Sequence, residues 1–130
     1  MYLKKGGLCI ICLLFLCLVG CSSSNDVSYK KSGIHEDFPV PAKAKSSTVQ
    51  FENIYIKTGE KYSLKNIGGK QGLYPPTDYL EEINNWGWEE LTEERMGHVQ
   101  FFRKGNTIIS IVFKEDYFEL FEMKEDFPLN

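Results

Sequence analysis

The chain of 130 residues is 42% hydrophobic and 25% charged, with a formal net charge of −3. These values predict one small globular domain and, without a basic excess, argue against nucleic acid as a partner. Of the four cysteines only Cys21 lies outside an apolar segment near the N-terminus. If that segment is removed, no cysteine pair is left for a disulfide, and no cysteine cluster for zinc or redox chemistry.

Residues 1–20 have the organisation of a secretory signal peptide. Lys4 and Lys5 give a positive start, residues 8–19 form an apolar run, and Gly20 is a small residue before the expected cleavage site. As a helix the run would measure about 18 Å, which is too short for a hydrocarbon core of about 30 Å. The alternative interpretation is an uncleaved short membrane helix that ends near Cys21.

The four residues Leu18-Val19-Gly20-Cys21 resemble the bacterial lipobox: an aliphatic residue, a small or β-branched residue, a small residue and cysteine. This resemblance implies cleavage between Gly20 and Cys21, a diacylglycerol group on the Cys21 sulfur, and possible acylation of the new amino terminus. Two or more acyl chains anchor a protein stably to a bilayer. The resemblance thus implies a lipoprotein at the extracytoplasmic side of the cell membrane, with Cys21 as its site residue.

Charge is unevenly distributed along the chain that cleavage would leave. Loss of Lys4 and Lys5 changes the net charge from −3 to −5. Residues 26–77 carry eight lysines and five acids (+3), whereas residues 78–130 carry five basic residues and thirteen acids (−8). This pattern favours an orientation in which the first half faces an anionic lipid surface.

Residues 21–47 are predicted to be the lipidated N-terminus and a flexible tether. They are rich in serine and charge, contain two prolines, and show no sustained period. Phe38 and Val40 could dock an extended end of this segment on the domain. His35, followed by two carboxylates, could form a weak metal-binding pair, but a solvated tether is the favoured interpretation.

The folded domain is predicted over residues 48–130. Alternating and β-branched residues indicate strands at 48–57 and 61–67, the first with a bulge. Residues 68–72 are glycine-rich, but they lack the serine or threonine after lysine, and the directly following helix, that a phosphate loop requires. A loop without a phosphate site is therefore expected there.

One helix is predicted from about Thr77 to Trp86. Asp78 and Glu81 have the spacing of a capping box, and Gly87 is placed to end the helix in a left-handed conformation. Trp88 and Trp86 are interpreted as core or rim aromatics rather than a ligand cage.

Residues 89–94 contain four glutamates. The cluster invites a cation-binding or acid–base hypothesis, but it lacks the pattern of a calcium loop. A solvated acidic edge is preferred.

A C-terminal β-meander is the clearest prediction, with strands at 97–104, 107–114 and 117–124. Gly105-Asn106 is a two-residue hairpin signal. One face of the meander is predicted to contain Val99, Phe101, Ile109, Ile111, Phe113, Phe118 and Leu120. The opposite face is also partly apolar and is predicted to contain Phe102, Ile108, Val112, Phe121 and Met123. The second face is either covered by the first two strands or left partly exposed as a contact surface. His98 is read as a surface or edge residue.

Together these elements predict an α+β fold: an antiparallel sheet of about five strands with one helix, a C-terminal meander and an N-terminal tether. Residues 38–42, 86–88 and 101–106 resemble packing motifs of small extracytoplasmic lipoproteins of Gram-positive bacteria. That resemblance implies the fold but carries no activity and no further site residue.

We therefore expect a lipid-anchored binding or accessory protein that contacts the membrane through its anchor and an envelope protein through its sheet or acidic edge. No cofactor, metal or nucleic acid is expected, and no catalytic group of nucleophile and base is evident in the sequence. The alternatives are a hydrolase that acts on the cell envelope and a self-associating surface protein.

Overall fold

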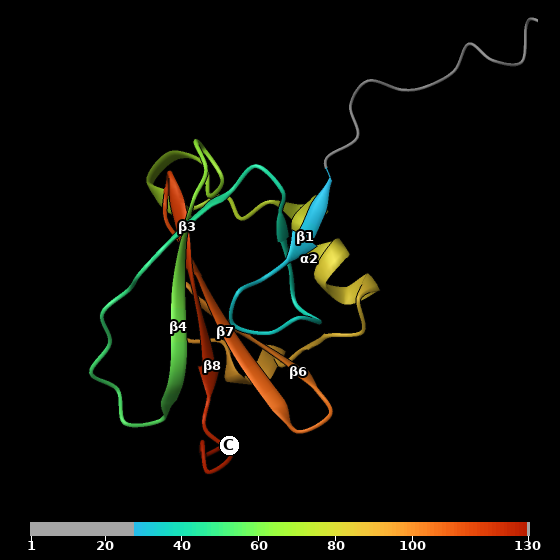
Figure 1. Cartoon of the computed structure of the whole chain (residues 1–130), viewed down its shortest axis with the longest axis vertical. Coiled ribbons are helices and arrows are strands. Elements are labelled where there is room, and N and C mark those ends of the chain that lie inside the picture. The colour runs from blue at the N-terminus through green and yellow to red at the C-terminus, as the bar shows by residue number, and fades with distance from the viewer. Residues whose placement is uncertain (1–27, 130) are drawn as a thin grey trace, which may run out of the picture.

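The computed structural model describes residues 28–129, so the predicted signal peptide and Cys21 lie outside the described residues. The main sheet has six antiparallel strands in the order β3-β4-β8-β7-β6-β5, and β1 and β2 form a separate two-stranded ribbon (Figure 1). The predicted α+β class is confirmed, with six strands in the main sheet. The elements are β1 (Tyr29–Lys31), β2 (Pro39–Pro41), β3 (Lys45–Ser47), β4 (Ile56–Ser63), η2 (Lys70–Gly72), α2 (Thr77–Asn85), β5 (Glu89–Glu90), η3 (Thr92–Glu94), β6 (Val99–Lys104), β7 (Thr107–Phe113) and β8 (Tyr117–Met123).

The C-terminal meander β6-β7-β8 forms as predicted. Lys104 pairs with Thr107 across the two-residue turn. Gly105 has a φ of 60°, whereas Asn106 is not among the residues with positive φ. Positive φ at the first central position alone is the pattern of a type II′ turn, whose twist matches that of the flanking strands.

The register of this turn decides which face of β6 is buried. Phe102 pairs with Ile109 and Phe101 pairs with Ser110, and directly opposed residues of an antiparallel pair share a face. Phe102 therefore lies on the core face, and the prediction that Val99 and Phe101 line that face was wrong by one residue. Because side chains alternate, a shift of one position moves every side chain of the strand to the other face.

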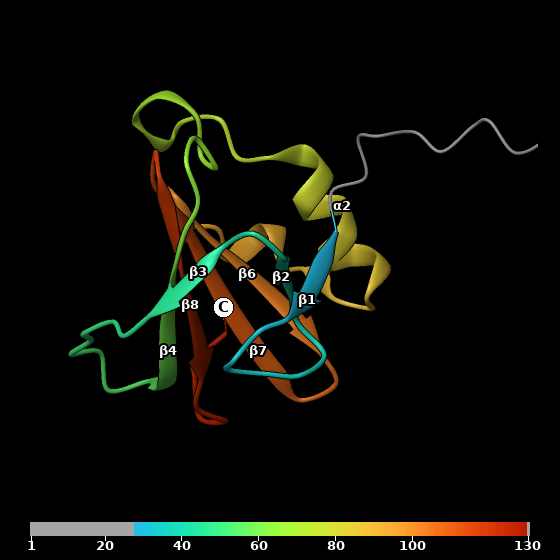
Figure 2. The same cartoon turned by 45° about the horizontal axis from the view of Figure 1, so that its top comes forward.

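The core lies between one face of the sheet and a layer made by α2 and the β1–β2 ribbon (Figure 2). Tyr79 and Ile83 of α2 are buried, and the Tyr79 ring stacks on that of Tyr29 at 6.0 Å between centroids. The buried residues of this core are Phe38, Val40, Ala44, Tyr62, Tyr79, Ile83, Trp88, Phe102, Ile109, Ile111, Phe113, Phe118 and Leu120.

The segment before residue 48 departs most from expectation, because residues 29–47 contain three strands instead of a flexible tether. Phe38 and Val40 have 0% exposure. The Tyr79 hydroxyl donates to the Pro39 carbonyl at 2.8 Å, and the Trp88 indole N–H donates to the Asp37 carbonyl at 2.9 Å. The predicted tether is therefore wrong for residues 29–47, although the suggested docking of Phe38 and Val40 is confirmed.

The first long strand is also displaced from its predicted place. Residues 48–55 form no strand, and β4 runs from Ile56 to Ser63. Gly59, which falls between the two predicted strands, lies inside β4 against Phe121 of β8, where a Cβ atom would approach the ring to 2.6 Å. A close backbone-to-ring contact thus explains the glycine.

Two irregular segments cover part of the second sheet face. Phe51, in the segment before β4, packs edge-on against Phe121 at 6.1 Å between ring centroids. Phe127, after β8, stacks on Phe101 at 5.4 Å. The predicted cover by the first two strands is therefore wrong, because the partial cover comes from loops. The face remains partly exposed, as in the other predicted alternative.

Helix α2 has the predicted position but a different start. Its N-cap is Pro76, and no side chain caps it, so the predicted capping box does not form. At the other end Gly87 has the predicted left-handed backbone, with φ of 97°. The Lys104 ammonium group donates to the Trp86 carbonyl at 2.8 Å, which satisfies a carbonyl at the negative end of the helix dipole.

Candidate functional site

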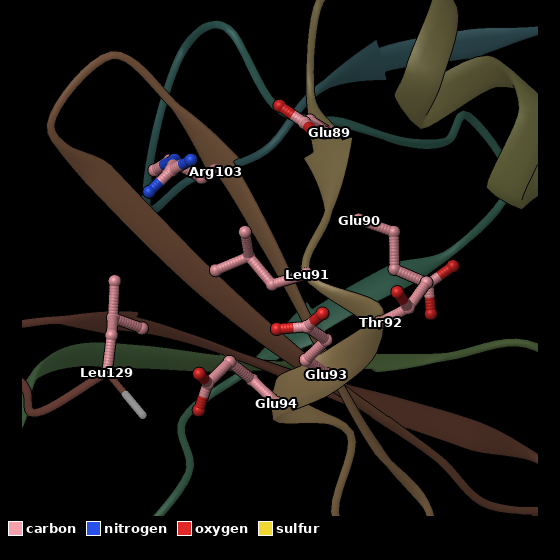
Figure 3. A pocket seen from close by; sticks show the side chains of 8 residues that line it. All are labelled: Glu89, Glu90, Leu91, Thr92, Glu93, Glu94, Arg103 and Leu129. Atoms are coloured by element: carbon pink, nitrogen blue, oxygen red, sulfur yellow. The ribbon is translucent and has the colours of Figure 1, made fainter.

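The glutamates of residues 89–94 line a surface depression of about 330 Å³ at one edge of the sheet (Figure 3). It lies where β5, only two residues long, ends and the chain continues into η3. The lining residues are Glu89, Glu90, Leu91, Thr92, Glu93, Glu94, Arg103 and Leu129.

The carboxylates of this depression do not converge on one point. Those of Glu89 and Glu94 lie at opposite ends of it (Figure 3). Glu90 forms an ion pair with Arg95 and accepts a hydrogen bond from the Gln100 amide at 3.2 Å. Across residues 28–129, no group of three or more histidine, cysteine, aspartate or glutamate side chains could hold a metal ion. Spread carboxylates beside two leucines can contact cationic and apolar groups of a larger molecule.

The two histidines occupy separate places. His35 packs edge-on against Trp88 at 5.3 Å between ring centroids, and its Nδ1 accepts the Asp37 backbone N–H at 3.2 Å. His98 is exposed beside Arg95 in a small hollow of about 230 Å³ that Leu73 also lines. The structure thus does not bring them together, and His98 has the predicted surface position.

A second depression, of about 440 Å³, lies at one end of the sheet and is basic. Its lining residues are Lys43, Lys45, Ser63, Leu64, Lys65 and Asp116. Three lysines from two separate parts of the chain meet there because Lys45 pairs with Ser63 between β3 and β4. Sequence reasoning missed this cluster, and only the net charge of +3 over residues 26–77 indicated it.

Within residues 28–129, no helix is long and apolar enough to cross a membrane. The one site residue predicted from the sequence, Cys21, lies outside these residues. No protein-family model, no curated protein and no solved structure matches this chain.

Proposed function

We propose that this protein is a lipid-anchored extracytoplasmic lipoprotein that serves as a binding or accessory protein at the outer face of the cell membrane. The observation that carries the proposal is the sequence Leu18-Val19-Gly20-Cys21 at the end of a short apolar run. Diacylglycerol on the Cys21 sulfur would provide the anchor, and further acylation of the amino terminus would strengthen it.

The start of the folded domain supports this proposal. Strand β1 begins at Tyr29, eight residues after Cys21, so that an acylated Cys21 need not be accommodated in the core. Cleavage before Cys21 would also leave the chain without a second thiol. A binding role is favoured over catalysis because the carboxylates of the acidic depression are spread along an edge and one of them is paired with Arg95.

The anchor is tested by substitution in a bacterial host with lipoprotein processing. Cys21→Ala should leave the chain uncleaved and without lipid, whereas Cys17→Ala, inside the apolar run, should be processed like the original chain. Intact-mass measurement and incorporation of labelled fatty acid distinguish the two outcomes. Equal masses and equal label for Cys21→Ala and the original chain would refute the anchor.

The binding role is tested by crosslinking in intact cells. A photoreactive residue at Glu93, in the acidic depression, should capture an envelope protein, which mass spectrometry can identify. Lys57, exposed on β4, is the matched control position. If both positions recover the same background proteins, and the purified protein turns over an envelope polymer, then the hydrolase alternative replaces the binding role.

A further inference from the structure

One end of the main sheet gathers loops that are far apart in the sequence. Ser63 at the end of β4 pairs with Tyr117 at the start of β8, and Phe113 at the end of β7 pairs with Phe118. The loops that leave these positions therefore lie together. The loop that follows β4 is the yellow-green loop at the top of Figure 1. We call this surface the loop end and define it as residues 42–45, 64–76, 95–98 and 114–116.

The loop end exposes large apolar side chains. Leu73, Tyr74 and Met96 are 52%, 69% and 71% exposed, in contrast to the buried side chains of the core. Leu73 and the 95–98 turn line the same hollow. An apolar residue that is half exposed or more, beside an aromatic residue, is the kind of group that enters a membrane interface.

Backbone hydrogen bonds hold the 64–76 loop in place. The Asn66 N–H donates to the Asp116 carboxylate at 2.9 Å, and the Gln71 N–H donates to the Glu115 carboxylate at 3.0 Å. The Tyr74 N–H donates to the Gly68 carbonyl at 2.8 Å. Hydrogen bonds therefore fix the backbone that carries the exposed Leu73 and Tyr74 side chains.

Charge distinguishes this end from the opposite one. The loop end contains five lysines and two carboxylates, which give a formal charge of +3. Arg95 is not counted because it pairs with Glu90. If Asp78 in the first turn of α2 is included, the charge is +2. The segments at the opposite end, 48–55, 105–106 and 124–129, contain one lysine and three carboxylates, a charge of −2. The five lysines are Lys43, Lys45, Lys65, Lys70 and Lys114.

The described chain begins at this same end. The Ala42 N–H donates to the Ser28 carbonyl at 2.9 Å, so Ser28 lies next to Lys43, and β1 starts near the top of Figure 1. Ser28 is seven residues after Cys21. Seven residues span at most about 25 Å, so a lipid on Cys21 would hold this end close to the bilayer.

We propose that the loop end docks on an anionic bilayer surface when the protein is anchored. This inference rests on the proposed lipid anchor. Leu73, Tyr74 and Met96 enter the interfacial region, and the lysines contact lipid phosphates. The acidic depression, which is built on the part of β6 nearer the opposite end of the sheet, remains in water.

Spin labelling of the anchored protein tests this orientation. Because the lipid occupies the Cys21 sulfur, a cysteine introduced by Tyr74→Cys or Asn106→Cys is the only thiol to label. Asn106 lies in the turn at the opposite end of the sheet. The labelled lipoprotein is reconstituted in vesicles of phosphatidylcholine and phosphatidylglycerol, and collisions of the nitroxide with oxygen and with an aqueous nickel chelate are measured.

We expect the label at residue 74 to favour oxygen and the label at residue 106 to favour the chelate. Lys65→Glu together with Lys70→Glu should return residue 74 to water. Loss of the two lysines alone lowers the docked-to-free ratio about 30-fold. Lys57→Glu with Lys124→Glu changes the net charge equally and should leave residue 74 protected.

Four outcomes would overturn the inference. A lipidated protein with both labels equally open to the chelate refutes the docking but leaves the anchor intact. Protection at residue 74 that increases with protein density in the vesicles assigns the loop end to a second copy of the chain, and protection only in intact cells assigns it to a protein partner. An intact mass without lipid refutes the proposed function and the docking together.

Discussion

Replacement of Phe38 by alanine tests whether the segment before residue 48 is part of the folded domain. Phe38 is fully buried and packs edge-on against Trp88 at 5.1 Å and against Phe102 at 6.3 Å between ring centroids. Truncation of a buried phenylalanine costs about 3–5 kcal/mol of unfolding free energy, because it removes apolar burial and leaves a cavity. A flexible tether would lose almost nothing.

The matched control is Phe51→Ala. Phe51 lies in the region that the sequence predicted as a core strand, but it is 41% exposed and contacts Phe121 at the rim of the second sheet face. Full burial of such a side chain stabilises by about 1.5–3 kcal/mol. Partial burial without a closed cavity should therefore cost about 1 kcal/mol.

Urea unfolding of the soluble chain that begins at Ser22 measures both effects. With a denaturant dependence of about 1–3 kcal/mol per molar urea, Phe38→Ala should lower the midpoint by about 2 M, and Phe51→Ala by less than 1 M. Far-ultraviolet circular dichroism avoids the direct effect of Phe38 on Trp88 fluorescence. If the alanine variant does not fold, Phe38→Leu should give a smaller loss in the same direction. A loss at Phe38 that is equal to or below the loss at Phe51 would refute the reasoning.

Two further predictions concern tyrosine ionisation and glycine geometry. Burial raises the pKa of Tyr62 to about 12 and that of Tyr79 well above its usual 10.0. Below pH 10 both phenols are neutral in the folded and in the unfolded chain. Above pH 10 they lose their protons in the unfolded chain before they do so in the folded chain. The unfolding free energy should therefore fall by about 1.4 kcal/mol per pH unit for each tyrosine. Urea titrations at pH 8–11.5 measure this fall; Tyr62→Phe should make it shallower, and an equal fall in that variant would contradict the assignment. Gly68→Ala should lower the melting temperature more than Gly105→Ala, because a Cβ at residue 68 would meet the Lys114 carbonyl oxygen. Residue 105 has open space around it, so Gly105→Ala costs only the left-handed backbone penalty of about 1–2 kcal/mol. Calorimetry that gave the reverse order would count against the contact at residue 68.

The meander could be predicted because its determinants are local. The two-residue turn with Gly105 at its first position determines how β6 and β7 pair. The helix was equally predictable, since Leu80 and Ile83 repeat at helical spacing and Gly87 follows. The prediction of which face of β6 is buried was wrong because β6 carries apolar side chains on both faces. Only its pairing with β7 across the turn identifies Phe102 as the core residue.

The ribbon before residue 48 could not be predicted, because its strands are three residues long and carry no detectable period. Pro39 and Val40 are buried in a segment whose Pro39 carbonyl accepts from Tyr79 of α2 and whose Asp37 carbonyl accepts from Trp88. Those hydrogen bonds join residues about 40–50 positions apart. The loop end is a similar case, since its five lysines come from separate segments that the sheet pairing brings together. No local sequence pattern predicts such a surface.

The sequence by itself determined the signal segment and lipobox as predictions, and the helix, the three C-terminal strands and their turn as findings that the structure confirms. These features depend on the chemistry of neighbouring residues. Only the tertiary structure decided where the domain begins, which side of β6 is buried, and which charges share an end of the sheet. Those properties depend on contacts between distant segments, whose energies no short stretch of the chain contains.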